Sequence, residues 1–400
     1  MVLFCIMVML ERFSFYGLRS IIVLYAISSD GLDLPRKLVL NNYENFGHLI
    51  ILLLLPMGII TDLILRQKRA IVIGGIISLA GYLLIFSQDL TTLVLGLILI
   101  ITGSSLVRLN IPVLITRLFE KTDTKRNLGM AIYILMINLG AFLASLTVVL
   151  VAETMSYKIA LFLIFISSFI YLLIYLANVN RIKFSETNIE STVFFKMKNL
   201  KKINWKLMLL IVIILLIYVT FIFTSTLIYN YAINIFSTIN DINLYGIEVT
   251  SSMLISSIYV FSIPINLIIV VLWAVKGAGK TLNNILWGFL FLGISLITLY
   301  ISLSPNDQIS AFVLIPFFLL SLAELIILPL LFSYSTRISD TRFTSTVYSV
   351  LLIVSAISFD LFQNQTASSS LIIMATICFL LTTLIFWQKS RIYKIAEPLQ

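Results

Sequence analysis

Charged side chains are scarce in this sequence. They make up 11% of its 400 residues, whereas 60% of the residues are hydrophobic and the mean hydropathy is +1.08. Soluble globular domains carry about 25% charged residues, so this composition leaves too little polar surface for a water-soluble protein. Cysteine is also scarce: Cys5 and Cys378 both lie in apolar runs, and they indicate neither a disulfide framework nor a metal site.

Long apolar runs follow one another along the chain. A bilayer core requires about 20 apolar residues per helix, and backbone groups in lipid must be paired within helices or a closed barrel. The runs do not alternate between apolar and polar residues, which favours helices over a barrel. We therefore expect an all-α polytopic membrane protein with twelve transmembrane helices. These are predicted at residues 2–28, 43–65, 69–88, 91–116, 127–151, 157–179, 206–236, 247–274, 281–303, 309–335, 343–363 and 369–388.

Lysine and arginine are distributed unevenly between alternate loops. Twenty-one of the 27 lie in one set of loops, three lie in the opposite set, and Arg12, Arg19 and Arg108 fall within helices. This asymmetry is the positive-inside pattern, so we expect a multi-pass protein of the cell (cytoplasmic) membrane with both termini cytoplasmic. The net charge of +9 then reflects topology signals that face anionic lipid and not nucleic-acid binding. Because the first apolar run is interrupted by charges, we interpret it as a mature helix and not as a signal peptide.

The segment 181–205 is the one break in this composition. It is polar and basic, and it separates two sets of six predicted helices. Two such halves joined by a cytoplasmic loop are typical of the major facilitator fold. We therefore predict an N-terminal six-helix bundle at 1–180, a cytoplasmic linker loop at 181–205 and a C-terminal six-helix bundle at 206–400.

Polar and ionisable residues near the middle of a membrane helix indicate a transport pathway or site. At 1.5 Å per residue, Arg12, Arg108, Asn138 and Glu324 lie roughly 13–20 Å from the ends of their helices. They come from four helices in both halves of the chain. Alternating-access transporters bind their substrates at this depth, so these four residues are candidates for a substrate site.

One face of the first helix is cationic and aromatic. Arg12, Phe15, Tyr16 and Arg19 follow the spacing i, i+3, i+4 and i+7, which places them on one face. Such a face suits a carboxylate or phosphate group. The structural alternative is that Glu11 forms an ion pair with an arginine and locks the helices together.

Five segments carry recognisable motifs. They are residues 11–19 followed by Tyr25, residues 58–69, residues 103–110, residues 127–142 and residues 323–329. The first resembles E-x-x-E-R-F-x-Y-Y-G-x-R, the first-helix signature of the proton-dependent oligopeptide transporter family of the major facilitator superfamily. The third and fifth are similar to the family's G-x-G-x-x-K-P-N and G-E-x-x-x-x-P segments, and the fourth to its helix 5 signature. The second resembles a loop motif that the whole superfamily shares.

This resemblance implies symport of di- and tripeptides with protons by alternating access, with the proton gradient as energy source and no cofactor. The substrate-binding residues that it implies are Arg19, Tyr16, Tyr25, Arg108, Asn138 and Glu324. In the family, the two cations face the peptide carboxylate, and the asparagine and glutamate face its amine. Proton coupling is implied at Glu11, Arg12 and Glu324, and gating at Gly58, Asp62, Arg66 and Arg69. The expected partners are a short peptide or another small zwitterionic or anionic substrate, protons and the lipid bilayer, with the protein acting as a monomer.

The sequence departs from the family pattern at titratable positions. Val8 replaces the first glutamate of the signature, and Arg108 replaces a lysine, although arginine cannot release a proton in the physiological range. The helix 5 tyrosine is Ile134, with Tyr133 beside it, and the seventh helix offers only hydroxyl groups at 224–226. The predicted site therefore carries one excess positive charge.

Two alternatives stay open. The departures favour a family member with altered coupling or substrate, such as a facilitator or exchanger of amino acids or organic anions. A member that binds a ligand and signals without transport is the second alternative. An enzyme is not expected, because the sequence offers no nucleophile–base pair and its one glycine-rich loop lacks the spacing and strand of a phosphate loop.

Overall fold

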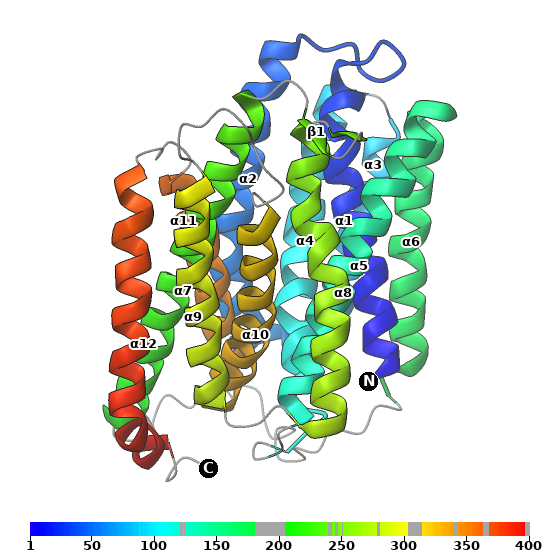
Figure 1. The fold of residues 1–400 in the computed structure, drawn as a ribbon. Helices are drawn as coiled ribbons and strands as arrows, with labels where there is room; N and C mark the ends of the chain where they lie inside the picture. The colour runs from blue at the N-terminus through cyan, green and yellow to red at the C-terminus, as the bar shows by residue number, and fades with distance from the viewer. Residues whose placement is uncertain are drawn as a thin grey trace. The chain divides into compact units, whose positions relative to one another are not determined.

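The computed structural model describes residues 1–87, 89–120, 123, 125–180, 205–238, 242–244, 247–249, 251–277, 281–302, 314–338, 343–362 and 368–396. These residues form twelve α-helices, one π-helical turn and one short hairpin (Figure 1). The elements are α1 (Val2–Ile27), α2 (Arg36–Ile60), η1 (Thr61–Leu65), α3 (Gln67–Ile85), α4 (Leu90–Thr116), α5 (Lys125–Thr154), α6 (Tyr157–Asn178), α7 (Trp205–Thr238), β1 (Ile242–Leu244), β2 (Ile247–Val249), α8 (Ser251–Lys276), α9 (Thr281–Ser302), α10 (Leu314–Ile338), α11 (Thr344–Phe362) and α12 (Ser368–Ala396).

The twelve predicted helices are confirmed, but several predicted ends were wrong; α2, for example, begins at Arg36 and not at residue 43. Residues 247–249, predicted to begin a helix, form β2, which pairs antiparallel with β1 so that Ile242 lies opposite Val249. The last helix continues to Ala396 and does not end at 388, because an apolar run marks the depth of a membrane and not the end of a helix. Almost all of the predicted linker, residues 181–204, lies outside the described residues, so the domain boundaries stay a prediction.

The outer surfaces of the helices are apolar. In the described part of the chain, seven helices are long and apolar enough to cross a membrane, and these are α3, α4, α5, α6, α7, α9 and α10. Large hydrophobic side chains are exposed along several helices; for example, Leu216, Val275 and Trp387 are 60%, 78% and 77% exposed. Exposed apolar surface of this extent is explained by contact with lipid.

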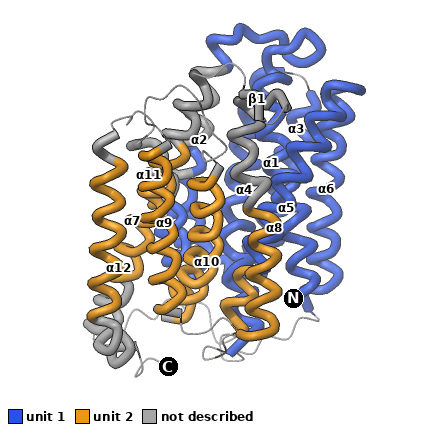
Figure 2. The backbone as a smooth tube through the Cα atoms, viewed as in Figure 1, with its two compact units in different colours: residues 1–120, 132–197, 339–353 blue, residues 121–131, 198–338, 354–400 orange. Residues whose placement is uncertain are grey.

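The chain forms two compact units that interleave along the sequence (Figure 2). Unit 1 comprises residues 1–120, 132–197 and 339–353, and unit 2 comprises residues 121–131, 198–338 and 354–400. Within unit 1, α3 packs against α4 and α6, and α1 packs against α6. Within unit 2, α9 packs against α10 and α12, and α8 packs against α10. The start of α11 therefore belongs to the same unit as α1 to α4.

Glycines bring α3 and α4 into close contact in unit 1. A Cβ atom on Gly74 would lie 2.6 Å from the carbonyl oxygen of Gly103, and one on Gly81 would lie 2.6 Å from that of Gly96. Small residues allow helix backbones to approach in this way in membranes, where packing must replace the hydrophobic effect. The contact fixes α4, the helix that carries Arg108.

Candidate functional site

The first-helix motif forms a buried ion pair. Glu11 and Arg12 are only 4% and 3% exposed. The Nε atom of Arg12 donates to Oε2 of Glu11, and Nη2 donates to Oε1 at 2.6 Å. The guanidinium carbon also lies 5.3 Å from the ring centre of Phe15 and 5.9 Å from that of Tyr16, within the range of cation–π attraction. Two hydrogen bonds and two aromatic rings therefore hold this charge pair in place.

Arg108 on α4 shares a small cavity with Arg12. The cavity has a volume of about 10 Å³, and Ser104 and Ser105 also line it. Among the described residues, Arg12 forms an ion pair with Glu11, whereas Arg108 forms none. The cavity therefore contains one cation that is neutralised by a carboxylate and one that is not.

The helix α5 approaches the charged face of α1 at Gly140. A Cβ atom on Gly140 would lie 2.5 Å from the carbonyl oxygen of Met9 and 3.0 Å from Cβ of Arg12, so the absence of a side chain permits this approach. Asn138 lies two residues earlier on the same helix and is half-buried. Residues two apart on a helix point to different sides, so the predicted place of Asn138 in the substrate site stays a prediction.

Tyr133 was missing from the predicted site residues. It is buried, its side chain is hydrogen-bonded to Tyr348 on α11, and it interacts electrostatically with Arg12 and Arg108. The signal was present in the sequence, because Tyr133 is adjacent to the position where the family has its helix 5 tyrosine. Tyr133, the neighbour of Ile134 on α5, therefore offers a tyrosine hydroxyl in this part of the helix.

The other predicted residues of α1 differ in their surroundings. Arg19 is exposed and Tyr16 is half-buried. Tyr25 is fully buried, its hydroxyl donates to the carbonyl oxygen of Ile85 at 3.3 Å, and its ring centre lies 5.8 Å from that of Tyr157. Tyr25 therefore joins α1 to α3 and α6, and its predicted contact with substrate stays a prediction.

Glu324 lies on α10 in unit 2, and its hydrogen-bond partner is a phenol. The hydroxyl of Tyr229 on α7 donates to Oε2 of Glu324 at 3.3 Å. The hydroxyls of Thr224, Ser225 and Thr226 donate instead to carbonyl oxygens of their own helix. Sequence reasoning missed Tyr229, although it follows Ser225 by four residues on the same helical face. That Glu324 faces the cations of unit 1 stays a prediction.

Asp62 connects the end of α2 to the start of α11. Its carboxylate accepts from the backbone N–H groups of Ser345 and Thr346 at 3.3 and 2.7 Å, and from the Thr346 hydroxyl at 2.9 Å. The first N–H groups of a helix lack partners within the helix, and their positive end attracts an anion. The Gln67 amide donates to Asp62 at 2.9 Å and to the Ser345 hydroxyl at 3.1 Å.

Further contacts extend this connection, which we call the α2–α11 contact. The Asn110 amide nitrogen donates to the Thr61 hydroxyl at 3.1 Å, and its carbonyl oxygen accepts from Ser345 at 2.9 Å. A Cβ atom on Gly58 would lie 2.6 Å from the hydroxyl oxygen of Ser349, so only glycine permits this spacing. Asn110 and the serines of α11 were not among the predicted gating residues.

Arg66 and Arg69 are placed differently from Asp62. In the described part of the chain, neither arginine forms an ion pair with it. Arg66 ends the π-helical turn with φ 62° and ψ 155°, a strained backbone for a residue other than glycine. Arg69 is exposed on α3. Asp62 therefore binds a helix terminus and not these side chains.

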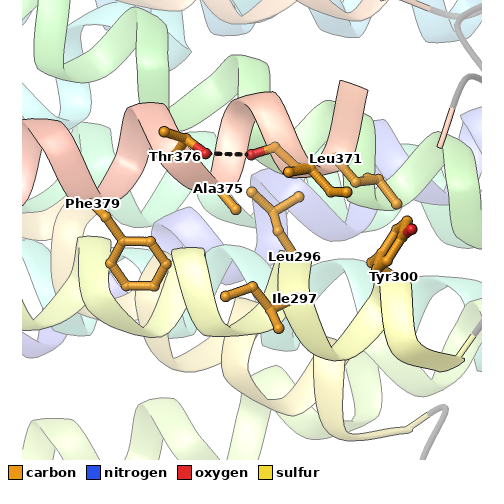
Figure 3. A pocket seen from close by; sticks show the side chains of 8 residues that line it. Leu296, Ile297, Tyr300, Leu371, Ala375, Thr376 and Phe379 are labelled. Carbon is orange, nitrogen blue, oxygen red and sulfur yellow. Dashed lines mark hydrogen bonds between the residues drawn. The ribbon is translucent and has the colours of Figure 1, made fainter. Parts of the chain in front are cut away.

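A second cavity, of about 210 Å³, lies between α9 and α12 in unit 2 (Figure 3). Apolar side chains such as Leu296 and Phe379 surround it, and the Thr376 hydroxyl donates to the carbonyl oxygen of Ile372 at 2.9 Å. Because its lining holds no charged side chain, this cavity does not suit a zwitterion.

Two relatives share part of their sequence with this chain. A di-/tripeptide transporter of Lactococcus lactis subsp. lactis (strain IL1403) is 33% identical over 155 residues, which are 37% of this chain and 31% of that protein. A peptide transporter of Yersinia enterocolitica subsp. palearctica is 34% identical over 146 residues, which are 34% of this chain and 28% of that protein. The similar segment thus spans less than a third of each relative's length.

Solved structures resemble the chain over nearly its whole length. A POT family transporter in complex with a thioalcohol-conjugated peptide has a TM-score of 0.65 at 19% identity, covering 98% of this chain and 96% of that one. The peptide transporter POT in complex with sulfate has a TM-score of 0.63 at 18% identity, covering 98% and 95%. These likenesses confirm the predicted major facilitator fold. The family model of the Major Facilitator Superfamily also matches residues 5–362 of the sequence. The chain therefore belongs to this superfamily of multi-pass membrane transporters.

Proposed function

We propose that this protein transports di- and tripeptides by alternating access and couples their uptake to protons. The observation that carries the proposal is Arg108, a cation without a carboxylate partner among the described residues, beside an arginine that Glu11 already neutralises. A short peptide is a zwitterion whose carboxylate suits such a cation. The two relatives named as peptide transporters support this substrate class. We infer a transport role and no catalytic one.

The proposal assigns each predicted substrate-binding residue to one end of the peptide. Arg108 and Arg19 receive the carboxylate, because guanidinium groups present paired N–H donors to its two oxygens. Glu324 and Asn138 receive the amine. The aromatic ring of Tyr16 lies beside the carboxylate end.

Proton exchange is assigned to Glu324. Its recorded hydrogen bond comes from the Tyr229 hydroxyl, a neutral donor that can serve the carboxyl group with or without its proton. Arg12 donates two hydrogen bonds to the side chain of Glu11. Glu11 therefore joins the coupling only when Arg12 releases it.

We further propose that the α2–α11 contact is a gate on the cytoplasmic side. Arg66 and Arg69 belong to the set of basic loops that the positive-inside pattern assigns to the cytoplasm. On this basis both termini are cytoplasmic, and the protein lies in a bacterial cytoplasmic membrane as a monomer without a cofactor. The gate opens when Asp62 leaves the N-terminus of α11.

Uptake of labelled dialanine into proteoliposomes, with and without an inward proton gradient, tests the proposal. We expect accumulation above equilibrium only with the gradient, and we expect Glu324→Gln to abolish it. Glu153→Gln is the matched control, because Glu153 is an exposed carboxylate near the end of α5. Unchanged uptake in both Glu324→Gln and Arg19→Ala would contradict the residue assignments.

The second candidate function is facilitated diffusion or exchange of organic anions. Val8 favours it, because this residue is 2% exposed and puts an apolar group where the resembling family has a glutamate. Arg108 favours it too, since a permanent cation attracts anions whatever the pH. Uptake that persists after the proton gradient is collapsed, and that a monocarboxylate competes for, would select this candidate over the first.

A further inference from the structure

The cavity between α9 and α12 is a groove that follows the two helices (Figure 3). Tyr300 and Leu371 lie at one end of it, and Phe379 lies at the other. Because Phe379 follows Leu371 by eight residues, the groove extends over about 12 Å at the helical rise of 1.5 Å per residue. A volume of about 210 Å³ spread over this length suits a narrow, elongated guest.

One side of the groove opens on the lipid-facing surface of unit 2. Leu296 and Leu371 are fully buried and form its wall, whereas Ile297, Tyr300 and Ile372 are 41%, 41% and 48% exposed and form its rim. The rim is continuous with the apolar outer surface of the helices, which contacts lipid. A guest therefore enters the groove from the bilayer.

The lining of the groove offers little to a water molecule. Thr376 and Tyr300 are its polar side chains among the described residues, and the Thr376 hydroxyl already donates to the carbonyl oxygen of Ile372 at 2.9 Å. A buried water needs about two to four polar partners, and apolar cavities of about 150 Å³ stay dry and take up apolar guests. Without a guest, the lining would also lose dispersion contacts. An apolar guest is therefore favoured over water.

The two ends of the groove differ. Phe379 closes the end that lies toward the middle of the helices, because its ring packs against Gly293, where a Cβ atom would lie 3.0 Å from the ring carbon Cζ. The other end lies near the end of α9 and the start of α12. Lys276 precedes α9, and Lys389 lies near the opposite end of α12, so the positive-inside pattern predicts that the groove lies in the outer leaflet.

We propose that this groove binds one acyl chain of an outer-leaflet phospholipid, with the ester end of the chain beside Tyr300 and its methyl end at Phe379. An acyl chain is narrow and apolar, and in a bilayer it runs along the spanning helices, as the groove does. The phenol of Tyr300 suits the polar end, because tyrosine rings favour the membrane interface. The head group stays outside the groove. The groove shares no residue with the predicted substrate site, so its test is independent of the proposed function.

Native mass spectrometry of the purified full chain in detergent counts the phospholipids that each chain retains. We expect one retained phospholipid in the parent and none in Ala375→Phe, because this substitution puts a ring into the groove. Ile294→Phe is the matched control and should keep the lipid, since Ile294 is an exposed residue of α9 outside the groove. A parent that retains none, or an Ala375→Phe variant that retains one, would overturn the proposal. A dimer that Ala375→Phe dissociates would also overturn it and would assign the groove to a second copy of the chain.

Cross-linking of the parent gives an answer that does not depend on how well a variant folds. A phosphatidylcholine with a photoactivatable diazirine at the methyl end of one chain is incorporated into proteoliposomes, and the modified residues are mapped by mass spectrometry. We expect modification at Phe379 and Gly293 to be several times higher than at Leu216 on α7, although Leu216 is 60% exposed and Phe379 is half-buried. Modification that follows exposure, with more at Leu216 than at Phe379, would overturn the proposal.

Discussion

Unit 1 and unit 2 each hold a glutamate within a membrane helix, Glu11 on α1 and Glu324 on α10. Glu11 accepts two hydrogen bonds from an arginine, whereas the recorded donor to Glu324 is the hydroxyl of Tyr229. A carboxylate paired with a cation keeps its charge and fixes the helices around it. One that is bonded to a neutral hydroxyl can change its protonation state at smaller cost. The same residue type thus serves as a structural ion pair in one unit and as a candidate proton carrier in the other.

The largest loss of stability among the variants that test these two roles should come from Glu11→Gln. This variant leaves the buried guanidinium of Arg12 without a counter-charge, and breaking a buried ion pair in this way costs about 3–5 kcal/mol. We expect the free energy of unfolding in detergent to fall by that amount. Chemical denaturation followed by tryptophan fluorescence measures it.

The control for this prediction is the double variant Glu11→Gln with Arg12→Gln. It removes both charges and should recover part of the lost stability, because no buried charge is then left unpaired. If the double variant is no more stable than Glu11→Gln alone, the ion pair is not the source of the loss.

Sequence patterns were sufficient for features that are local in the chain. Apolar runs of about 20 residues predict membrane helices, and the spacing of Arg12, Phe15, Tyr16 and Arg19 predicts a common face. These features lie within one helix, so no knowledge of the fold is needed to predict them. The sequence left open which arginine pairs with Glu11, because neighbouring residues on a helix do not face each other, and the structure pairs it with Arg12.

The partners of Asp62 could not be predicted in the same way. Ser345 and Thr346 follow it by 283 and 284 residues, and neither carries a charge. The attraction comes from backbone N–H groups at the start of α11, which any sequence would present there. The basic residues beside Asp62 in the sequence suggested ion-pair partners, but in the described part of the chain neither Arg66 nor Arg69 forms an ion pair with it. Tyr229 was missed for a similar reason, because a tyrosine in an apolar run is most often a packing residue.

A smaller loss of stability should follow from Asp62→Ala. The variant removes a charged acceptor from two N–H groups and one hydroxyl of α11, and hydrogen bonds to charged groups contribute about 1.5–3 kcal/mol. We therefore expect the free energy of unfolding to decrease by about 2–3 kcal/mol. Denaturation under the conditions used for Glu11→Gln gives the comparison.

Asp89→Ala is the matched control for this change. Asp89 also accepts from first-turn N–H groups, those of Thr91 and Thr92 at 3.0 and 3.2 Å, but it does so at the start of its own helix α4. Loss of such a cap costs about 1 kcal/mol. Equal losses in the two variants would mean that Asp62 is no more than a local cap and that the α2–α11 contact does not depend on it.

The smallest effect should come from Tyr229→Phe, which removes one hydroxyl and keeps the ring. A hydrogen bond between uncharged groups contributes about 1 kcal/mol to stability. We therefore expect the free energy of unfolding to decrease by about that amount when Glu324 carries its proton, and by more when it is ionised. A double-mutant cycle with Glu324→Gln measures the coupling between the two side chains. Thr226→Val is the control, since the hydroxyl of Thr226 donates only to the carbonyl oxygen of Ile222 on the same helix.

Repeating the double-mutant cycle across a pH series should show a coupling energy between Tyr229 and Glu324 that grows as Glu324 loses its proton. A coupling that stays constant with pH would contradict the contrast between the two glutamates.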